Sequence, residues 1–332
     1  MIVTDENFIL NKGKSREKET KGLYMNGYLK QNLDGIPPYL KKAWDVVGIV
    51  SGHGKVRIGK STMASQIAYY LAWLLAGGRQ ICHLEEIAGK QVWVQDKMIS
   101  PTKPVRFNLQ ENVVFEAEQL QKAAFALHDK YGKHQVILYD EGRQGLDSAR
   151  AMESINKGMG DFFETCGFMG HVILIVLPNF FKLHEDYAVA RSLFLIDVFA
   201  DKKNRRGYYN FYNERQKEWL YYLGKRRIGV TGKYEATWES FWGRFTDCLP
   251  FDKDEYEKLK KLALENKKLT RQDRKMRLQR DCFVWMLAKD HKVSAQEMVQ
   301  RLYEITDLEL TEQTINEAVA KISELKVSAK GY

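Results

Sequence analysis

One short stretch of the sequence combines glycines and cations at a spacing typical of phosphate binding. Residues 54–61, GKVRIGKS, fit the pattern G-x-x-x-x-G-K-[ST]. An apolar run at 46–51 precedes them, and apolar residues recur at helical spacing from 61 to 75. A glycine loop exposes consecutive backbone N–H groups, and the start of a helix adds its positive dipole end, so phosphate oxygens are favoured there. The strand–loop–helix context supports the motif and predicts a nucleotide site.

The residue types of this loop predict ATP and Mg²⁺ as cofactors. The ammonium group of Lys60 is expected to contact the β- and γ-phosphates, and the hydroxyl of Ser61 to bind Mg²⁺. Arg57 is expected to contact a phosphate or face a neighbouring subunit, and a solvated side chain is the equal alternative. The predicted nucleotide contacts are Gly54, Lys55, Arg57, Ile58, Gly59, Lys60, Ser61 and Thr62.

Two carboxylates follow a second apolar run, VILY at 136–139. Asp140 is expected at the carboxyl edge of the sheet, beside the phosphate loop, where it would hold Mg²⁺ through water. Glu141 is expected to polarise the attacking water, a role that separates hydrolysing enzymes from small-molecule kinases. The alternative is an acidic pair at the end of a strand with no catalytic role.

Two further residues are candidates for contact with the γ-phosphate. Asn179 follows the apolar strand at 171–177, although Pro178-Asn179 is equally a simple turn signal. Arg191 precedes the next apolar run and is a candidate to act in trans on a neighbouring subunit's γ-phosphate. The alternative for Arg191 is an ordinary surface arginine.

The charge balance favours a polyanionic partner. The chain has 332 residues, with 52 Lys and Arg against 43 Asp and Glu, giving a net charge of +9. Residues 201–233 hold ten of the cations and three of the anions. The predicted DNA contacts lie at the tip of a hairpin: Lys202, Lys203, Arg205 and Arg206. They would follow phosphates, and neighbouring aromatics at 208–212 would stack on bases. The alternative to DNA binding is a hairpin at the edge of the sheet whose charges prevent it from pairing with other strands and so keep the protein soluble.

Alternating strands and helices predict an α/β fold with a mainly parallel sheet and helices on both faces. Residues 192–224 contain three apolar segments that favour antiparallel strands at one edge. The expected organisation is an N-terminal arm (1–40), a P-loop ATPase domain (41–226), a linker with a basic helix (227–280) and an all-helical domain (281–332). The last domain suits a helix-turn-helix or winged-helix module that binds DNA, or a bundle that docks on a protein partner.

Other sequence features favour the cytoplasm, or the host cytoplasm for a viral protein. The N-terminus has no signal-like apolar region, and no apolar run approaches the roughly 20 residues of a membrane-spanning helix. The four cysteines lie far apart and predict neither a disulfide framework nor a zinc site.

The phosphate loop at Gly54–Thr62, the strand ending in Asp140-Glu141 and the strand at 171–179 with Asp186–Arg191 behind it resemble P-loop ATPases of the FtsK/HerA branch. They are similar to the Zot-like ATPases of phages and mobile elements, over about residues 40–225. The resemblance implies a RecA-like core, a homo-oligomeric ring and ATP-driven movement of double-stranded DNA. Proteins of that branch usually have Gln at the end of this strand, whereas this chain has Asn179, which is more similar to the residue found there in AAA+ proteins.

The sequence therefore supports three candidate functions, in order of preference. The first is an ATP-hydrolysing motor that translocates, packages or transfers DNA for a virus or mobile element. The second is an AAA+-type loader or accessory switch in replication or transposition, in which ATP controls assembly. The third is a small-molecule kinase, which Glu141, the basic hairpin and the helical C-terminus disfavour.

Overall fold

The computed structural model describes residues 2–3, 23–42, 46–52, 57–87, 89–140, 160, 162, 167–201, 204–228, 234–267, 271–306 and 311–329. The chain divides into two compact units, Met1–Leu264 and Glu265–Tyr332, each of which we describe by itself. Both ends of the predicted linker at 227–280 fall inside helices, α8 (Glu214–Ile228) and α10 (Arg271–Lys289). Residues 23–40, predicted as part of an arm, are largely helical and contribute Leu29, Leu33 and Ile36 to the core of the first unit.

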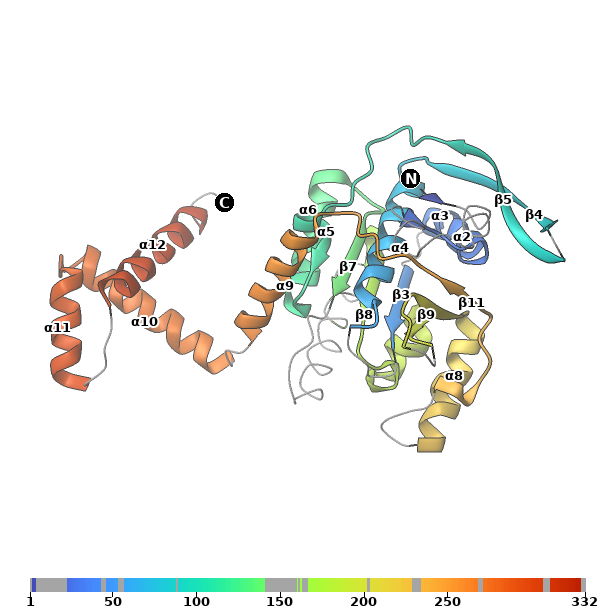
Figure 1. Cartoon of the computed structure of the whole chain (residues 1–332). Helices are drawn as coiled ribbons and strands as arrows, with labels where there is room; N and C mark the ends of the chain where they lie inside the picture. Colours follow the sequence, from blue (N-terminus) through green and yellow to red (C-terminus); the bar gives the residue numbers. More distant parts are fainter. Residues whose placement is uncertain are drawn as a thin grey trace. The chain divides into compact units, whose positions relative to one another are not determined.

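The first unit is built on a mainly parallel sheet (Figure 1). The strand order among the described residues is β11-β10-β9-β3-β8-β7-β6. The bounds are β3 (Val46–Ser51), β6 (Val113–Val114), β7 (Val136–Asp140), β8 (Val172–Val176), β9 (Ser192–Phe199), β10 (Tyr208–Tyr212) and β11 (Phe241–Arg244). All neighbours from β9 to β6 pair in parallel, whereas β10 pairs antiparallel with both β9 and β11. The predicted α/β class, parallel sheet and antiparallel edge are confirmed.

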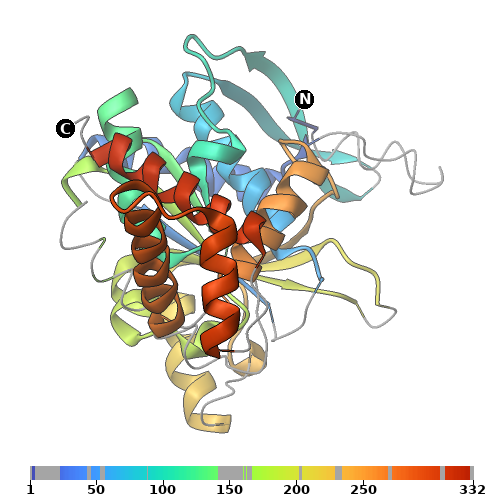
Figure 2. The same ribbon diagram turned by 90° about the vertical axis from the view of Figure 1, so that its left-hand side faces the viewer.

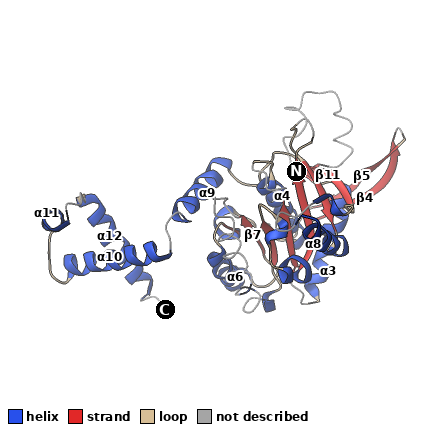
Figure 3. Ribbon diagram, turned by 90° about the horizontal axis from the view of Figure 1, so that it is seen from below, coloured by secondary structure: helices blue, strands red, loops and turns tan. Residues whose placement is uncertain are grey.

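Helices cover both faces of this sheet (Figure 3). One face packs against α2, α3, α4 and part of α9, and the other packs against α6 and α8. The bounds of the further helices are α2 (Gly27–Asp34), α3 (Ile36–Lys41), α4 (Lys60–Leu75), α5 (Leu109–Asn112), α6 (Ala117–Tyr131) and α9 (Lys253–Lys267). The short 3₁₀ or π segments are η1 (Gly167–Met169), η2 (Phe180–Lys182), η3 (Asp186–Arg191) and η5 (Tyr234–Ala236).

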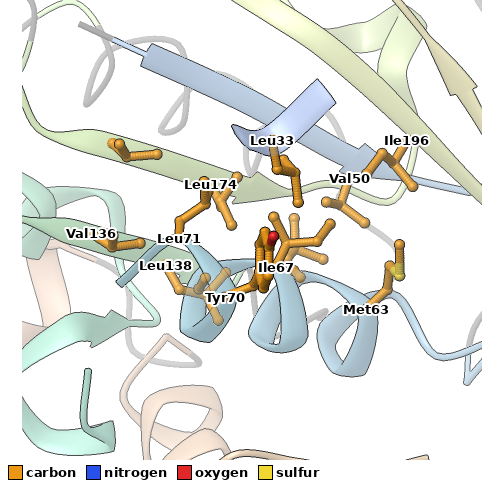
Figure 4. Close-up of a cluster of buried hydrophobic side chains, with 14 of the residues drawn as sticks. Leu33, Val50, Met63, Ile67, Tyr70, Leu71, Val136, Leu138, Leu174 and Ile196 are labelled. Carbon is orange, nitrogen blue, oxygen red and sulfur yellow. The ribbon is translucent and has the colours of Figure 1, made fainter. Parts of the chain in front are cut away.

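Helix α4, which follows the predicted phosphate loop, packs against the sheet (Figure 4). Met63, Ile67, Tyr70 and Leu71, predicted as its apolar positions, are all buried against strand residues such as Leu174. Their spacing of three and four residues places them on one helical face. The burial therefore sets the rotation of α4 and, with it, the position of Gly59 and Lys60 at its start.

The segment 218–224, predicted as a strand, is part of the helix α8, so this prediction was wrong. Its aromatic residues favour a strand locally, but the buried positions Lys217, Leu220, Tyr221 and Gly224 recur at helical spacing. Asn213 caps the helix by accepting a hydrogen bond from the backbone N–H of Gln216 at 3.0 Å. The tertiary packing of one helical face decides the structure here.

One hairpin does not join the central sheet. It consists of β5 (Lys90–Ile99), which pairs antiparallel with β4 (Arg79–Ile87) in a separate two-stranded sheet. Figures 1 and 2 show this hairpin extending beyond the central sheet. Two short segments, β1 (Ile2–Val3) and β2 (Leu23–Tyr24), form another pair, which is parallel.

The second unit is helical throughout its described residues, as predicted. It contains α10, α11 (Ala295–Thr306) and α12 (Glu312–Ala329). The hydroxyls of Ser294 and Thr311 cap α11 and α12, accepting from backbone N–H groups at 3.2 and 3.3 Å. Asp281 of α10 accepts hydrogen bonds from Arg280 and from Lys321 of α12, and these contacts hold the pKa of its carboxyl below the ordinary value although burial opposes them.

Candidate nucleotide-binding site

The start of α4 has the geometry expected of a phosphate-binding terminus. β3 ends at Ser51 and α4 begins at Lys60. Gly59 adopts the left-handed region, with φ 99°, and has no side chain that could cap the helix. The first backbone N–H groups of a helix have no partner within it, so they can bind an anion. Gly54 and Lys55, predicted as contacts, lie outside the described residues.

The other predicted loop residues divide by burial. Ile58 is buried and packs against Gly52, where a Cβ atom would lie 2.5 Å from Ile58 Cδ1. Arg57 is exposed, and Thr62 is half-buried next to Ser61. Ile58 therefore anchors the loop by packing, whereas the side chain of Arg57 is accessible to solvent.

The predicted metal ligands lie together at the carboxyl edge of the sheet. The Ser61 hydroxyl donates a hydrogen bond of 3.1 Å to Asp140 Oδ1, across 79 positions of sequence. Asp140 ends β7 and is 1 % exposed. Because β3, β8 and β7 are parallel neighbours, their carboxyl ends share one edge. Glu141, the predicted base, lies outside the described residues.

Two residues of α9, which the sequence analysis missed, complete this cluster. The Lys260 ammonium group donates to Asp140 Oδ2 at 2.9 Å, to Ser61 Oγ at 3.0 Å and to the Tyr256 hydroxyl at 2.9 Å. Tyr256 also donates to Asp140 Oδ2. Burial, followed by the Asp140 carboxylate, raises the pKa of the Tyr256 hydroxyl, which therefore remains a donor. A Tyr–Lys pair four residues apart on a charged helix has no local feature that would identify this contact.

This cluster fits the predicted cofactors. A cationic ammonium group already lies against a serine hydroxyl and a buried carboxylate, so the position stabilises positive charge. Hydroxyl and carboxylate oxygens are also the hard ligands that Mg²⁺ prefers. Ser61 and Asp140 could hold the metal, and Lys60 with the start of α4 could hold the phosphates.

Asn179 follows β8, the strand that lies between β3 and β7. It is half-buried, and its Oδ1 accepts a hydrogen bond of 2.9 Å from Phe181 N, which fixes the side chain at the start of η2. The next backbone N–H, that of Phe180, donates to the hydroxyl of buried Tyr234 at 2.9 Å. The same hydroxyl lies 3.0 Å from Ser51 Oγ, so Tyr234 connects the segment after Asn179 to the end of β3.

Arg191 lies away from the site of its own chain. It ends η3 immediately before β9, and Ser192, the first residue of β9, pairs with Val47 near the start of β3. Arg191 is therefore near the amino edge of the sheet, opposite to the edge that carries Asp140. Its exposed side chain leaves a role in a neighbouring subunit as a prediction.

The predicted basic hairpin lies at the same edge as the phosphate loop, because β9 runs parallel to β3. Arg206 is exposed, whereas the guanidinium of Arg205 donates to Asp201 Oδ2 at 2.5 Å. Lys202 and Lys203 lie outside the described residues. Of the aromatics expected to stack on bases, Tyr209, Phe211 and Tyr212 are buried in the core of the sheet, so that part of the prediction was wrong.

One aromatic residue lies between the phosphate loop and this hairpin. The backbone N–H of Phe245 donates to Gly207 O at 3.0 Å, immediately before β10. Its ring packs against Gly59, where a Cβ atom would lie 2.8 Å from Phe245 Cζ. Phe245 therefore contacts both Gly59 and Gly207.

Comparison with protein-family models, with curated proteins and with solved structures finds no match to this chain. Within the described part of the chain, no helix is both long enough and apolar enough to cross a membrane. The same residues contain no group of three or more His, Cys, Asp or Glu that could hold a metal ion. A metal at Ser61 and Asp140 would therefore need further oxygen ligands from water or from a bound phosphate, which is the usual arrangement for Mg²⁺.

Proposed function

We propose that this protein is an ATP-hydrolysing, DNA-handling motor with a RecA-like core. The observation that carries the proposal is the contact of Ser61 with Asp140 beside the start of α4. It supports a site in which a phosphate-binding helix terminus and a hard-cation position lie side by side. The strand order, with β8 between β3 and β7, further supports it because Asn179 then follows the strand between the two halves of the site.

The chain's own residues have distinct roles in hydrolysis of ATP by water to ADP and phosphate. Lys60 and the first N–H groups of α4 would bind the phosphates, and Ser61 and Asp140 would hold the metal. Mg²⁺, when bound, neutralises charge on the phosphate oxygens. Glu141 orients the attacking water and accepts its proton. Asn179 contacts the γ-phosphate, and a neighbouring subunit supplies Arg191.

The DNA part of the proposal rests on the basic hairpin. Exposed Arg206 lies at the edge that also carries the nucleotide site, and Phe245 connects the hairpin to Gly59. A shift of the phosphate loop on hydrolysis would therefore be transmitted to a surface that binds backbone phosphates. A ring of subunits would place several such hairpins on one DNA duplex.

ATP hydrolysis with and without double-stranded DNA tests the proposal, at low and moderate salt, with Lys60→Ala as the inactive control. We expect stimulation by DNA that weakens with salt, because released counterions contribute to the binding. Arg206→Ala should reduce the stimulation, while Arg215→Ala, an exposed arginine on α8 outside the hairpin, should not. A rate of ATP hydrolysis that does not change when DNA is added would overturn the proposal that the protein is a motor.

Mixing two inactive variants tests the ring. A Lys60→Ala subunit keeps its Arg191, and an Arg191→Ala subunit keeps its phosphate loop. If Arg191 acts in trans, mixed rings contain some complete sites and recover activity, whereas each variant alone stays inactive. Absence of recovery in rings that are shown to mix would place Arg191 outside the reaction.

A loader or switch of the AAA+ type is the second candidate, and the position of Asn179 at the end of the central strand favours it. Displacement of a third strand from triplex DNA separates the two functions, because a motor displaces it processively and a switch does not. Phosphoryl transfer to a small acceptor without DNA would instead support the kinase.

A further inference from the structure

We propose that α9 carries an internal block of the nucleotide site. The ammonium group of Lys260 takes the place of the metal, and binding of a Mg²⁺–nucleotide displaces it. The displacement loosens the part of α9 that leads into the second unit. This inference deepens the proposed function and rests on it.

The contacts of Lys260 are those of a cation in the metal position. It donates to both predicted metal ligands, Ser61 Oγ at 3.0 Å and Asp140 Oδ2 at 2.9 Å. Mg²⁺ binds oxygen at about 2.0–2.1 Å and carries two charges, so an ammonium group that is hydrogen-bonded to the same oxygens opposes its binding. Repulsion between two cations in a partly buried site is strong, since water screens it poorly. The metal therefore binds more favourably once the ammonium group has left.

Two residues of α9 have separate roles: one anchors the helix, and the other blocks the metal position. Tyr256 is 3 % exposed and packs between the rings of Phe115 and Phe251, with centroid distances of 5.8 and 5.4 Å. It therefore holds the first half of α9 in place. Lys260 lies one turn further along, and its side chain is 20 % exposed, so its flexible stem can move the ammonium group into solvent.

Release of Lys260 would weaken the attachment of the second half of α9. Two of the side-chain hydrogen bonds of Lys260, to Ser61 and Asp140, attach the second half of α9 to the start of α4 and the end of β7, and Ala263 adds a buried apolar contact. α9 runs from Lys253 to Lys267 and passes the boundary between the units after Leu264. Nucleotide binding would thus lower the stability of the part of α9 that leads into the second unit.

Calorimetric titration of Mg²⁺–ADP into the full-length protein, without DNA, tests the block. Lys260→Ala removes the competing cation, so we expect binding at least about tenfold tighter than in the unmodified chain, where tenfold corresponds to about 1.4 kcal/mol. Lys260→Gln keeps the length and polarity without the charge and should tighten binding in the same way. The matched control is Lys261→Ala, which removes the same charge from an exposed position of the same helix and should change nothing.

Hydrogen exchange of the backbone amides gives a second measurement that does not depend on activity. In the unmodified chain, Mg²⁺–ADP should speed exchange at residues 261–264, after Lys260, and leave the turn around Tyr256 protected. In Lys260→Ala, exchange at residues 261–264 should already be fast without nucleotide.

Each outcome has a distinct meaning. Binding that is unchanged or weaker in both Lys260 variants overturns the block, and weaker binding would make Lys260 a ligand of the nucleotide. Unchanged exchange at 261–264 overturns the loosening of α9. Absence of Mg²⁺–ADP binding in all variants overturns the nucleotide site and this inference with it. Failure of DNA to stimulate hydrolysis overturns the motor alone, since these measurements use no DNA.

Discussion

The ring of Phe245 packs directly against Gly59, the residue that precedes Lys60 at the start of α4. Phe245 is 6 % exposed, and its backbone N–H holds the carbonyl of Gly207 at the end of the basic hairpin. A single residue thus touches both the predicted phosphate-binding loop and the predicted DNA-binding loop. Movement of either loop requires Phe245 to move or the packing to open.

Replacing this ring should weaken the connection between the loops. We expect Phe245→Leu to lower the DNA-stimulated rate of ATP hydrolysis more than the rate without DNA, because the smaller side chain leaves space beside Gly59. Steady-state rates at saturating ATP measure both. Phe107→Leu is the matched control, since Phe107 is 8 % exposed and its ring packs against Phe251, away from both loops. Equal losses in the two variants would contradict the connection.

The hydroxyl of Tyr234 should contribute to stability. In Tyr234→Phe, the buried backbone N–H of Phe180 loses its acceptor, and we expect the free energy of unfolding to fall by about 1–3 kcal/mol. Urea unfolding measures the change. Tyr39→Phe, at a position 43 % exposed, should alter stability by only a few tenths of a kcal/mol. A fall in Tyr234→Phe as small as that expected for Tyr39→Phe would show that the hydroxyl of Tyr234 contributes little to stability.

Gln66 should stabilise the segment that leads from β11 to α9. Its buried amide group donates to Thr246 O at 2.7 Å and to Cys248 O at 2.8 Å. Gln66→Met keeps the volume but leaves both carbonyls without this donor, so we expect a loss of about 2–4 kcal/mol in the free energy of unfolding. Gln119→Met, on the exposed face of α6, provides the control in the same urea experiment. A loss below 1 kcal/mol would mean that other donors replace Gln66.

Acid should destabilise the first unit through His171. This residue is fully buried, and its Nδ1 accepts from Gln135 N at 3.0 Å, so Nε2 carries the proton and donates to Ala124 O at 3.2 Å. Burial, with a smaller effect from His128 and His134, lowers the pKa of His171 from 6.5 to about 4.

Because the pKa of His171 is lower in the folded chain, the free energy of unfolding should rise with pH. Between about pH 6.5 and 4 the unfolded chain binds a proton at His171 that the folded chain does not. The stability contributed by the neutral ring is therefore complete above pH 6.5 and is lost as the pH falls, by up to about 3 kcal/mol. Urea unfolding at several pH values measures the slope. His171→Gln should flatten it, and an unchanged slope in this variant would contradict the prediction.

The sequence by itself determined the parts of the molecule that depend on local pattern. Glycines at 54 and 59 before Lys60 predicted a phosphate loop, and the periodicity of Met63, Ile67 and Tyr70 identified the buried face of α4. The rule that parallel strands end at one edge placed Ser61 beside Asp140 in advance. These features follow from backbone conformation and side-chain spacing within a few residues.

Only the tertiary structure decided the rest, because it depends on which distant surfaces pack together. Residues 218–224 have strand-like composition, but the burial of Leu220 and Tyr221 against the sheet makes them helical. The contact of Lys260 with Asp140 joins residues that are 120 positions apart in the sequence. The path of the chain from β11 to α9 brings Lys260 to this position, and contacts of Gln66 and Phe245 hold that path against α4 and Gly59. No local pattern encodes that path, since each of its contacts is stable only when the others have formed.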